Sequence, residues 1–374
     1  MDLANVFDVL TQGIANFTWQ NAVMIVVGGV LIILAIVKQY EPMLLLPIGI
    51  GCIFANVGMS AYEDNFLGIL YKAGIETELF PLMIFIGVGA MIDFRPLLAM
   101  PSMAMLGAAG HFGIYATLIL AALLGFELNE AASIAAIGTI DGPTAIFVTS
   151  RLAPEMLGPI AVAAYSYMSL VPIIQPPIMK ALTTRKERMI RMEYAQRKIS
   201  DRVMIMFPIV VAVLVAVIAP DAAPLIASLM LGNLLRESGV VDRLSKSAQN
   251  EIINIATLFL GLTVGATMTG ENFVRLDTLY ILILGLFAFV LDSVGGLLFG
   301  KLLAAVTKGK VNPLVGACGI SAFPMSGRLS AQVALEEDPD NFILMHAMGS
   351  NTAGQLASVV AGSVLFALVV GLIP

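Results

Sequence analysis

Charged residues are scarce in this chain. Asp, Glu, Lys and Arg together make up 12% of its 374 residues, about half of their share in soluble globular proteins. Apolar residues make up 59% of the chain, and the mean hydropathy is +0.93. This balance argues against a soluble fold and indicates a lipid bilayer as the solvent. We therefore predict an all-α polytopic membrane protein.

Cysteine and histidine are almost absent. Cys52 and Cys318 stand in apolar surroundings without the spacing of metal ligands, so we expect buried thiols rather than a disulfide or a metal site. His111 and His346 each stand alone within an apolar segment. A packed or hydrogen-bonded histidine is expected there ahead of a catalytic one, and the sequence leaves the role of both open.

Several motifs of energy-coupled and hydrolytic chemistry are also missing. The chain has no GxxxxGK[ST] phosphate loop, no HExxH or CxxC metal set and no GxSxG nucleophile turn. An ATP-driven or conventional hydrolytic mechanism therefore has no visible apparatus, and any pumping must use another source of energy. No feature of the sequence points to a nucleic-acid partner.

Apolar runs, in contrast, recur along the chain. About 20 residues cross roughly 30 Å of hydrocarbon, and we expect about ten transmembrane segments. The clearest are Asn21–Lys38, Ser102–Phe126, Met204–Pro220, Thr278–Gly300 and Thr352–Ile373. Residues 1–78 fit this plan less well, because Trp19 and Tyr40 are typical of interface anchors and residues 61–78 are polar enough to lie outside the hydrocarbon. We expect residues 1–78 to form scaffold or oligomer contacts.

Basic residues gather in one short connection between apolar segments, residues 181–202. They are Arg185, Lys186, Arg188, Arg191, Arg197, Lys198 and Arg202, preceded by Lys180. Loops rich in Lys and Arg stay on the cytoplasmic side of a membrane, so we predict a cytoplasmic loop. A charge run that merely solvates a loop predicts the same side.

The chain repeats itself on either side of this basic loop. FIGVGAM at residues 85–91 parallels GLTVGAT at 261–267, and GTIDGPTAIFVTSRLAPE at 138–155 parallels GISAFPMSGRLSAQVALEED at 319–338. We assign residues 79–180 to a first repeat and residues 203–374 to the second half. Our count of about five crossings before the basic loop favours inverted repeats, which many carriers place around their substrate site.

Each repeat carries a Pro/Gly break within an apolar segment, at Gly142 and Pro143 in the first and at Pro324 in the second. Proline removes a backbone donor, so the break frees carbonyl groups at membrane depth. These are tolerated only where protein, water or an ion satisfies them. We therefore predict a broken-helix hairpin at residues 138–155 and another at 312–339, and each is a candidate site.

Asp141 stands at the first break, within an apolar run. An ionised carboxylate there costs on the order of 2.5–3.5 kcal/mol unless it faces a cation, a partner or water. Cation or proton binding is the favoured interpretation, and the alternative is a structural cap on a short helix that begins at Thr144. Carbonyls at Gly142 and Pro143, together with the Thr144 hydroxyl, would supply the oxygen ligands that hard cations prefer.

Other polar residues accompany the two breaks. Tyr165 and Tyr167 lie in one helix, and each could face the first break or simply be packed with its hydroxyl bonded. Asn312, Ser321 and Asn351 stand near the second break. Buried amides and hydroxyls need partners, and a dehydrated Na⁺ would use several of their oxygens at once.

Arg328 follows the second break. A guanidinium cannot be deprotonated in a protein, so Arg328 either meets an anionic group such as a carboxylate substrate or forms a structural ion pair. Asp292 is a third intramembrane acid, which could be that ion-pair partner or part of a proton path. The sequence leaves its role open.

Three motifs together resemble a known family. They are GTIDGPTAIF at residues 138–147, AAYSYMSLVPIIQPPIMKALTTRKERMIRM at 163–192 and NPLVGACGISAFPMSGR at 312–328. From about Leu79 to its end the chain resembles the β subunit of the sodium-pumping biotin-dependent decarboxylases, which act on oxaloacetate, methylmalonyl-CoA or glutaconyl-CoA.

The resemblance implies a carboxybiotin decarboxylase subunit that consumes a proton and exports Na⁺. It implies catalytic roles for Asp141, Tyr167 and Arg328, with Arg328 near the carboxybiotin. The implied Na⁺-binding residues are Asp141, Asn312, Gly316, Ser321 and Asn351.

The resemblance also implies partners: a carboxyltransferase α subunit, a biotin carrier protein and a small membrane γ or δ subunit. It leads us to expect a trimer of this chain, surrounded by lipid, in the cytoplasmic (inner) membrane of a bacterium or archaeon. A secondary Na⁺/H⁺ exchanger or Na⁺-coupled carboxylate carrier is the rival function, since it would use the same broken helices. A purely structural anchor would not explain Asp141 and Arg328. The sequence leaves open the acyl substrate and the Na⁺ stoichiometry.

Overall fold

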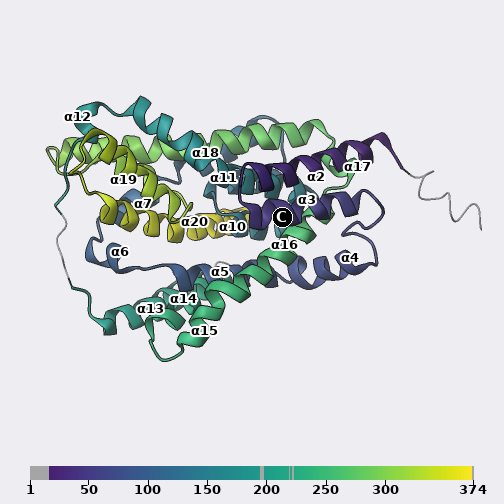
Figure 1. Cartoon of the computed structure of the whole chain (residues 1–374), viewed down its shortest axis with the longest axis horizontal. Coiled ribbons are helices and arrows are strands. Elements are labelled where there is room, and N and C mark those ends of the chain that lie inside the picture. Colours follow the sequence, from purple (N-terminus) through teal and green to yellow (C-terminus); the bar gives the residue numbers. More distant parts are fainter. Residues whose placement is uncertain (1–16, 194–197, 219, 221–222, 373–374) are drawn as a thin grey trace, which may run out of the picture.

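The computed structural model describes residues 17–193, 198–218, 220 and 223–372, and over these residues it is built from helices without strands (Figure 1). The prediction of an all-α protein is confirmed for this part of the chain. Residues 1–16 of the expected scaffold and Arg197 of the basic loop lie outside the described residues.

Within the residues that the structure describes, six helices are long and apolar enough to cross a membrane. They are Trp19–Val37, Met103–Leu123, Asp201–Ile218, Asp242–Thr267, Leu276–Val306 and Leu344–Leu372. Two further pairs of helices, each bent by more than 40° at a short break, bring the number to eight if each pair is one span. The chain is therefore a multi-pass membrane protein, while the expected ten segments are not confirmed within the described residues.

One bent pair changes the expectation for residues 61–78. The helix Phe66–Glu76 passes the test for a span together with Leu79–Met91, at an angle of 58° between them. Its buried residues Leu67, Tyr71 and Ile75 recur at helical spacing and pack into the apolar core. Most of the polar residues that suggested a segment outside the hydrocarbon occupy the preceding loop and the opposite face, while Glu78, after the helix, is buried and pairs with Arg151.

The two halves of the chain follow a similar plan: an apolar helix, a short helix, a longer helical stretch, a 3₁₀ turn, the helix after the break and a long final helix. The first half contains α5 (Leu79–Met91), α6 (Arg95–Ala99), α7 (Met103–Ala109), α8 (Phe112–Leu123), α9 (Leu128–Ala136), the 3₁₀ turn η2 (Ile137–Thr139), α10 (Gly142–Leu152), the 3₁₀ turn η3 (Pro154–Met156) and α11 (Leu157–Leu182). The second half contains α16 (Ile253–Thr267), α17 (Gly270–Phe273), α18 (Leu276–Val306), the 3₁₀ turn η6 (Pro313–Cys318), α19 (Met325–Glu337) and α20 (Leu344–Leu372). This order supports the repeat, and its inversion stays a prediction.

Other helices precede and connect the two halves. They are α2 (Trp19–Val37), α3 (Pro42–Ala55), α4 (Phe66–Tyr71), the π-helical turn η1 (Lys72–Glu76), α12 (Arg185–Arg188), α13 (Asp201–Ile218), α14 (Ala223–Glu237), α15 (Asp242–Ser247) and the π-helical turn η5 (Ala248–Ile252).

Helix α3 packs between α2 and α16, and we call these three the scaffold helices. Small residues allow the close approach: a methyl group on Gly28 or Gly49 would lie 2.7 Å from the carbonyl oxygen of the other glycine. On the other side of α3, a methyl group on Gly265 would lie 2.1 Å from the Ile48 carbonyl oxygen. The scaffold helices therefore form a tightly packed layer beside the broken hairpins.

The basic loop is held against the end of the second hairpin. Arg188 donates to a Glu337 carboxylate oxygen at 2.6 Å, and Arg191 donates to Asp338 at 2.7 Å. Figure 1 shows α12 and α19 side by side at one end of the helix bundle, while α17 lies at the other end. The loop and the end of α19 therefore lie on the same side of the membrane.

Candidate functional site

The first break separates α9 and η2 from α10. Ile140 has a φ of 51°, in the left-handed region, and Asp141 is extended with a φ of −132°. Helix α10 then starts at Gly142, with Pro143 in its first turn, where a missing N–H costs nothing. Asp141 occupies the N-cap position, yet its carboxylate accepts no backbone N–H and instead accepts a bond from the Thr144 hydroxyl. Helix α10 thus donates one side-chain hydrogen bond to the carboxylate and no backbone hydrogen bond.

A tyrosine of α11 packs on this break, and it is Tyr165 rather than Tyr167. A methyl group on Gly142 would lie 2.0 Å from the Tyr165 ring, so the glycine is required by the ring that covers it. Tyr167 projects to another face of α11, where its hydroxyl donates to the Leu282 carbonyl of α18. Of the two tyrosines left open by the sequence, the structure brings only Tyr165 to Asp141.

At the second break, amide side chains satisfy the freed carbonyls. Gln175 of α11 donates to the Ala317 carbonyl at 2.7 Å and accepts from the Ser326 hydroxyl at 2.9 Å. Asn351 of α20 donates to the carbonyls of Cys318 and Ile320, at 3.1 and 2.7 Å. The backbone of this break is therefore held by helices from both halves of the chain.

The first break receives similar support from α20. The Ser358 hydroxyl lies 3.2 Å from the Thr139 carbonyl, and the His111 Nε2 atom lies 2.6 Å from the same hydroxyl. Each half thus contributes a polar side chain to the break of the other half.

Both breaks open onto one cavity of about 480 Å³. Asp141 and Ser321 line it, and their exposed fractions are only 7% and 5%. The Ser321 hydroxyl has no hydrogen-bond partner among the described residues. The other polar side chains in the lining are Glu41, Tyr165, Gln249, Asn254, Thr257 and Gln355.

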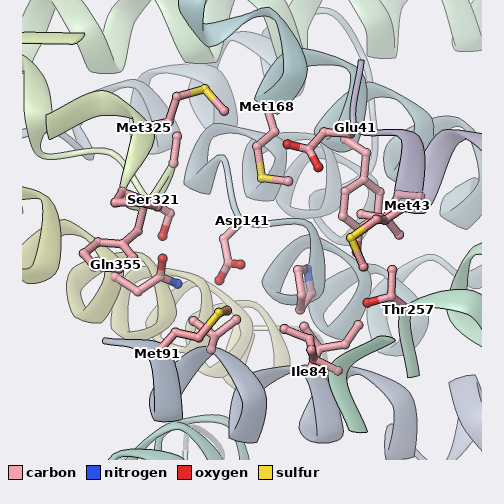
Figure 2. Close-up of a pocket in the computed structure, with 18 of the residues that line it drawn as sticks. Glu41, Met43, Ile84, Met91, Asp141, Met168, Thr257, Ser321, Met325 and Gln355 are labelled. Carbon is pink, nitrogen blue, oxygen red and sulfur yellow. The ribbon is translucent and has the colours of Figure 1, made fainter. Parts of the chain in front are cut away.

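Figure 2 shows how these groups are arranged. Asp141 lies between Ser321 and Gln355 on one side and Glu41 and Thr257 on the other. Most of the remaining lining is apolar. Carboxylate, hydroxyl and amide oxygens are ligands for a hard cation, so the arrangement fits the binding of Na⁺ as cargo. Among the described residues no three His, Cys, Asp or Glu side chains form a metal cluster.

Two of the expected Na⁺ ligands lie elsewhere. Asn312 caps η6 through its Oδ1 atom and donates to the carbonyls of Arg188 and Ile190, both at 2.9 Å. Its polar atoms are thereby used to join η6 to the basic loop. A methyl group on Gly316 would lie 2.0 Å from the Gly296 carbonyl oxygen, so this glycine permits the contact between η6 and α18. Neither residue lines the cavity.

Asn351 and Arg328 stand close in sequence to residues of the cavity without lining it. The Asn351 Oδ1 atom is buried and has no partner within the part of the chain that the structure describes. Arg328 is exposed, and the ion pairs of the described residues do not include it. The structural ion pair that was one alternative for Arg328 is therefore absent there.

Asp292 is not the partner of Arg328. It is fully buried in α18, and its Oδ1 atom accepts the Gly113 N–H at 2.6 Å, at the start of α8. The two cysteines are buried and free, as expected from the sequence. His111 is hydrogen-bonded between α7 and α20, and His346 contacts the Glu193 carbonyl at 3.3 Å.

Sequence reasoning missed five polar residues of the cavity, which are Glu41, Gln249, Asn254, Thr257 and Gln355. Gln355 lies four residues after Asn351, on the same face of α20, and this helical spacing could have revealed it. Glu41 belongs to the segment expected to be scaffold only, and its one signal is the Pro42 that follows and starts α3. The N-terminal helices therefore contribute to the site itself.

Known proteins give a consistent picture. Residues 20–369 match the family described as the Na⁺-transporting oxaloacetate decarboxylase beta subunit. The chain is 50% identical to the methylmalonyl-CoA decarboxylase subunit beta of Veillonella parvula, over 96% of this chain and 95% of the relative. It is 49% identical to the glutaconyl-CoA decarboxylase subunit beta of Acidaminococcus fermentans, over 96% of each chain.

A third relative is an oxaloacetate decarboxylase beta chain of Salmonella typhi, 44% identical over 96% of this chain and 98% of the relative. These matches extend over nearly the whole chain and include both breaks and the cavity. The chain belongs to the family of the Na⁺-transporting oxaloacetate decarboxylase beta subunit.

Proposed function

We propose that this membrane subunit of a Na⁺-translocating decarboxylase performs the last chemical step of its complex in the cavity between the two breaks. The step is the decarboxylation of carboxybiotin, with consumption of one proton and export of Na⁺. The observation that carries the proposal is that Asp141 from the first break and Ser321 from the second line the same cavity.

The Na⁺ cargo is bound by oxygen atoms from both hairpins. Asp141 supplies the negative charge, Ser321 a hydroxyl without a protein partner, and Gln355 an amide oxygen. Asn351, which does not line the cavity, holds the backbone of the second break in place through the carbonyls of Cys318 and Ile320. A buried carboxylate and a dehydrated cation compensate each other, because each would be costly alone in a medium of low polarity.

Protonation of Asp141 couples chemistry to transport. A neutral carboxyl group attracts Na⁺ much less than a carboxylate, so a proton that arrives at Asp141 releases the cation. Carboxybiotin on a partner would supply the carboxyl group that leaves as CO₂, and Asp141 would hold the one proton that this reaction consumes. We assign to Tyr165, which covers the break at Gly142, the assisting role that the sequence assigned to Tyr167.

Arg328 binds the anionic carboxyl group. Its exposure and its lack of an ion pair among the described residues leave the guanidinium available for an incoming carboxylate, to which it can donate two parallel hydrogen bonds. It stands in the first turns of α19, just after Met325 of the cavity lining. The residues present thus fit a carboxylated biotin that approaches this end of the cavity.

Membership of the family supports a proposal for the wider setting. The partners are a carboxyltransferase α subunit, a biotin carrier protein and a small γ or δ subunit, and the chain forms a trimer in the cytoplasmic membrane with the basic loop inside the cell. Relatives of similar identity are named for methylmalonyl-CoA, glutaconyl-CoA and oxaloacetate. The acyl substrate is therefore selected by a partner, and alternating access comes from movement of the hairpins against the scaffold helices.

The decisive experiment measures Na⁺ uptake into inverted proteoliposomes that contain this chain with its biotin-carrier and carboxyltransferase partners. Uptake is compared with and without acyl substrate, for the wild type and Asp141→Asn. We expect uptake that requires substrate and biotin and that is lost in the variant.

A matched control is Asp277→Asn, because Asp277 is exposed and lies outside the cavity. It should transport at the wild-type rate. If Na⁺ instead moves through the isolated chain down a proton or solute gradient, the chain is a secondary carrier and the decarboxylase mechanism must be withdrawn.

A further inference from the structure

The cavity holds a second carboxylate, Glu41, in an unusual backbone setting. Glu41 has φ 36° and ψ 59°, in the left-handed region that residues other than glycine, asparagine and aspartate rarely adopt. It precedes Pro42, which begins α3, and its carbonyl accepts from the N–H groups of Leu44 and Leu45, both at 3.0 Å. The backbone of Glu41 therefore has an energetically costly conformation where the scaffold helices adjoin the cavity.

The Glu41 side chain is not used to stabilise its own helix. It occupies the N-cap position of α3 but makes no capping bond, although such bonds commonly stabilise a helix. No hydrogen bond or ion pair holds the carboxylate within the described residues, and Lys38, three residues earlier, does not pair with it there. The carboxylate is directed into the cavity instead.

The polar groups of the cavity form two sets on opposite sides of Asp141 (Figure 2). Ser321 and Gln355 come from the second half, next to its break. Glu41 of α3 and Thr257 of α16 come from the scaffold helices. Between them, the Tyr165 hydroxyl is close enough to interact electrostatically with both Asp141 and Glu41.

A second observation points to a ligand in this space. The Ser321 hydroxyl is 95% buried, has no protein partner among the described residues and lines the same cavity. A buried hydroxyl without a partner is costly, and one that lines a cavity can be satisfied by a group that enters the cavity. Two carboxylates and a free hydroxyl around one space suit a small cation far better than an anion.

We propose that Glu41 is a second cation-binding station, on the scaffold side of the cavity and across Asp141 from Ser321 and Gln355. This proposal rests on the proposed function and adds a residue to it. The cation then has a carboxylate oxygen ligand beside the scaffold helices as well as beside the first break.

The test compares two substitutions that tolerate the same backbone. Asp and Asn both adopt the left-handed region readily, so Glu41→Asp and Glu41→Asn differ mainly in charge. The Na⁺ concentration for half-maximal decarboxylation is measured with the assembled complex. We expect Glu41→Asn to raise this concentration about tenfold, because the cation loses its contact with one charged group. Glu41→Asp keeps the charge and should raise the concentration much less.

Glu251→Gln is the matched control, because Glu251 is exposed on η5 and does not line the cavity. It should leave the half-maximal Na⁺ concentration unchanged. If Glu41→Asn does not assemble, the comparison is made with Glu41→Gln, which is closer in shape to the wild type.

The possible outcomes separate the two proposals. Decarboxylation that does not depend on Na⁺ in the wild type overturns the proposed function. A Na⁺-dependent wild type with equal half-maximal concentrations in Glu41→Asn and Glu41→Asp overturns the role of Glu41 alone. An equal shift in Glu251→Gln has the same consequence, because it would reflect only the net charge of the protein.

Discussion

Ser321 is the residue whose surroundings say most about its role. Its hydroxyl is buried, has no partner among the described residues and lines the cavity that Asp141 also lines. The Ser363 hydroxyl, by comparison, donates to the Val359 carbonyl at 2.8 Å. Other buried hydroxyls also lack a partner among the described residues, but they do not line the cavity; they are those of Thr117, Thr149, Ser293, Ser350 and Thr352. The position of Ser321 in the cavity is therefore what supports the proposal that its partner is the transported ion.

Ser321→Ala should therefore weaken Na⁺ binding without weakening the fold. Removal of the hydroxyl deletes one oxygen ligand, and we expect the Na⁺ concentration for half-maximal decarboxylation to rise about five- to tenfold. The free energy of unfolding should change by less than about 1 kcal/mol, because no protein hydrogen bond is lost. Na⁺-dependent decarboxylation and thermal unfolding in detergent measure the two quantities.

Ser363→Ala serves as the comparison. It removes a buried hydroxyl of α20 that bonds within its own helix, so it should leave the response to Na⁺ as in the wild type. A Ser321→Ala protein with normal Na⁺ dependence would contradict a ligand role for this hydroxyl.

The sequence allowed the prediction of Asp141 and Ser321 because an acid and a hydroxyl beside a helix break have few other uses. It could not separate Tyr165 from Tyr167, since the choice depends on which face of α11 meets Gly142. Asn312 was misleading for a similar reason. A buried amide needs partners, but here the partners are backbone carbonyls of the basic loop.

At the scale of helices, α8 depends on a side chain from the other half of the chain. The break between α7 and α8 leaves N–H groups at the start of α8 without partners in their own helix. Asp292, in the middle of α18, accepts the Gly113 N–H there at 2.6 Å. The acid thus ties two transmembrane elements together.

Substitution of Asp292 separates this bond from any role of its charge. Asp292→Ala leaves a buried N–H unsatisfied and should lower the free energy of unfolding by about 1–3 kcal/mol. Asp292→Asn keeps an oxygen acceptor and should lower it by less than about 1 kcal/mol. Thermal unfolding in detergent gives both values, and equal losses in the two variants would mean that the carboxylate charge itself is needed.

The contact between the basic loop and the end of α19 should depend on pH. The hydrogen bond from Arg188 lowers the pKa of Glu337, and the bond from Arg191 lowers the pKa of Asp338. Carboxyl groups with a lowered pKa stabilise the folded state above their ordinary values, 4.5 and 3.8. This contribution is lost as the pH falls through the lowered values. We expect the loop to be released below about pH 4.

Pepsin cleavage of the loop measures that release, since the enzyme is active in acid. The double variant Glu337→Gln/Asp338→Asn should be cut faster than the wild type near pH 5, and the difference should vanish as the pH falls. A difference that persists at all pH values would show that protonation of these two carboxyls does not open the loop.

Helix breaks were predictable because proline and glycine have local effects that do not depend on the fold. The partners of the freed carbonyls were not predictable. Gln175 and Asn351 reach the second break from far away in sequence, and only the packing of α11 and α20 brings them there. The same limit applies to α4, because the burial of one of its faces depends on the helices that pack against it.

For the molecule as a whole, the structure predicts which parts of the chain lie on opposite sides of the membrane. α12 and α17 lie at opposite ends of the helix bundle (Figure 1). In a parent protein with Cys52 and Cys318 replaced by Ala, Lys186→Cys should be labelled by a membrane-impermeant maleimide only in inverted vesicles. Glu271→Cys should be labelled only in right-side-out vesicles, because the positive-inside rule places the basic loop in the cytoplasm.

Labelling of both positions from the same side would contradict the arrangement of the helices. Labelling with the two sides exchanged would contradict the cytoplasmic position of the loop and leave the arrangement intact.

The general architecture was accessible from composition and repetition, since both are properties of the whole chain. The number of spans was not, because bent pairs such as Phe66–Glu76 with Leu79–Met91 do not appear as single apolar runs. The sequence also did not predict that the scaffold helices contribute residues to the lining of the cavity. It depends on how α3 and α16 meet the hairpins, which no local pattern records.

The mutual support of the two breaks limits how this protein can be recombined. Gln175 of the first half bonds to Ser326 of the second, while Ser358 of the second supports Thr139 of the first. A chimera that joins the first half of one relative to the second half of another must inherit these pairs together. Natural substitutions are constrained in the same way, because a change at one member of a pair has to be matched in the other half of the chain.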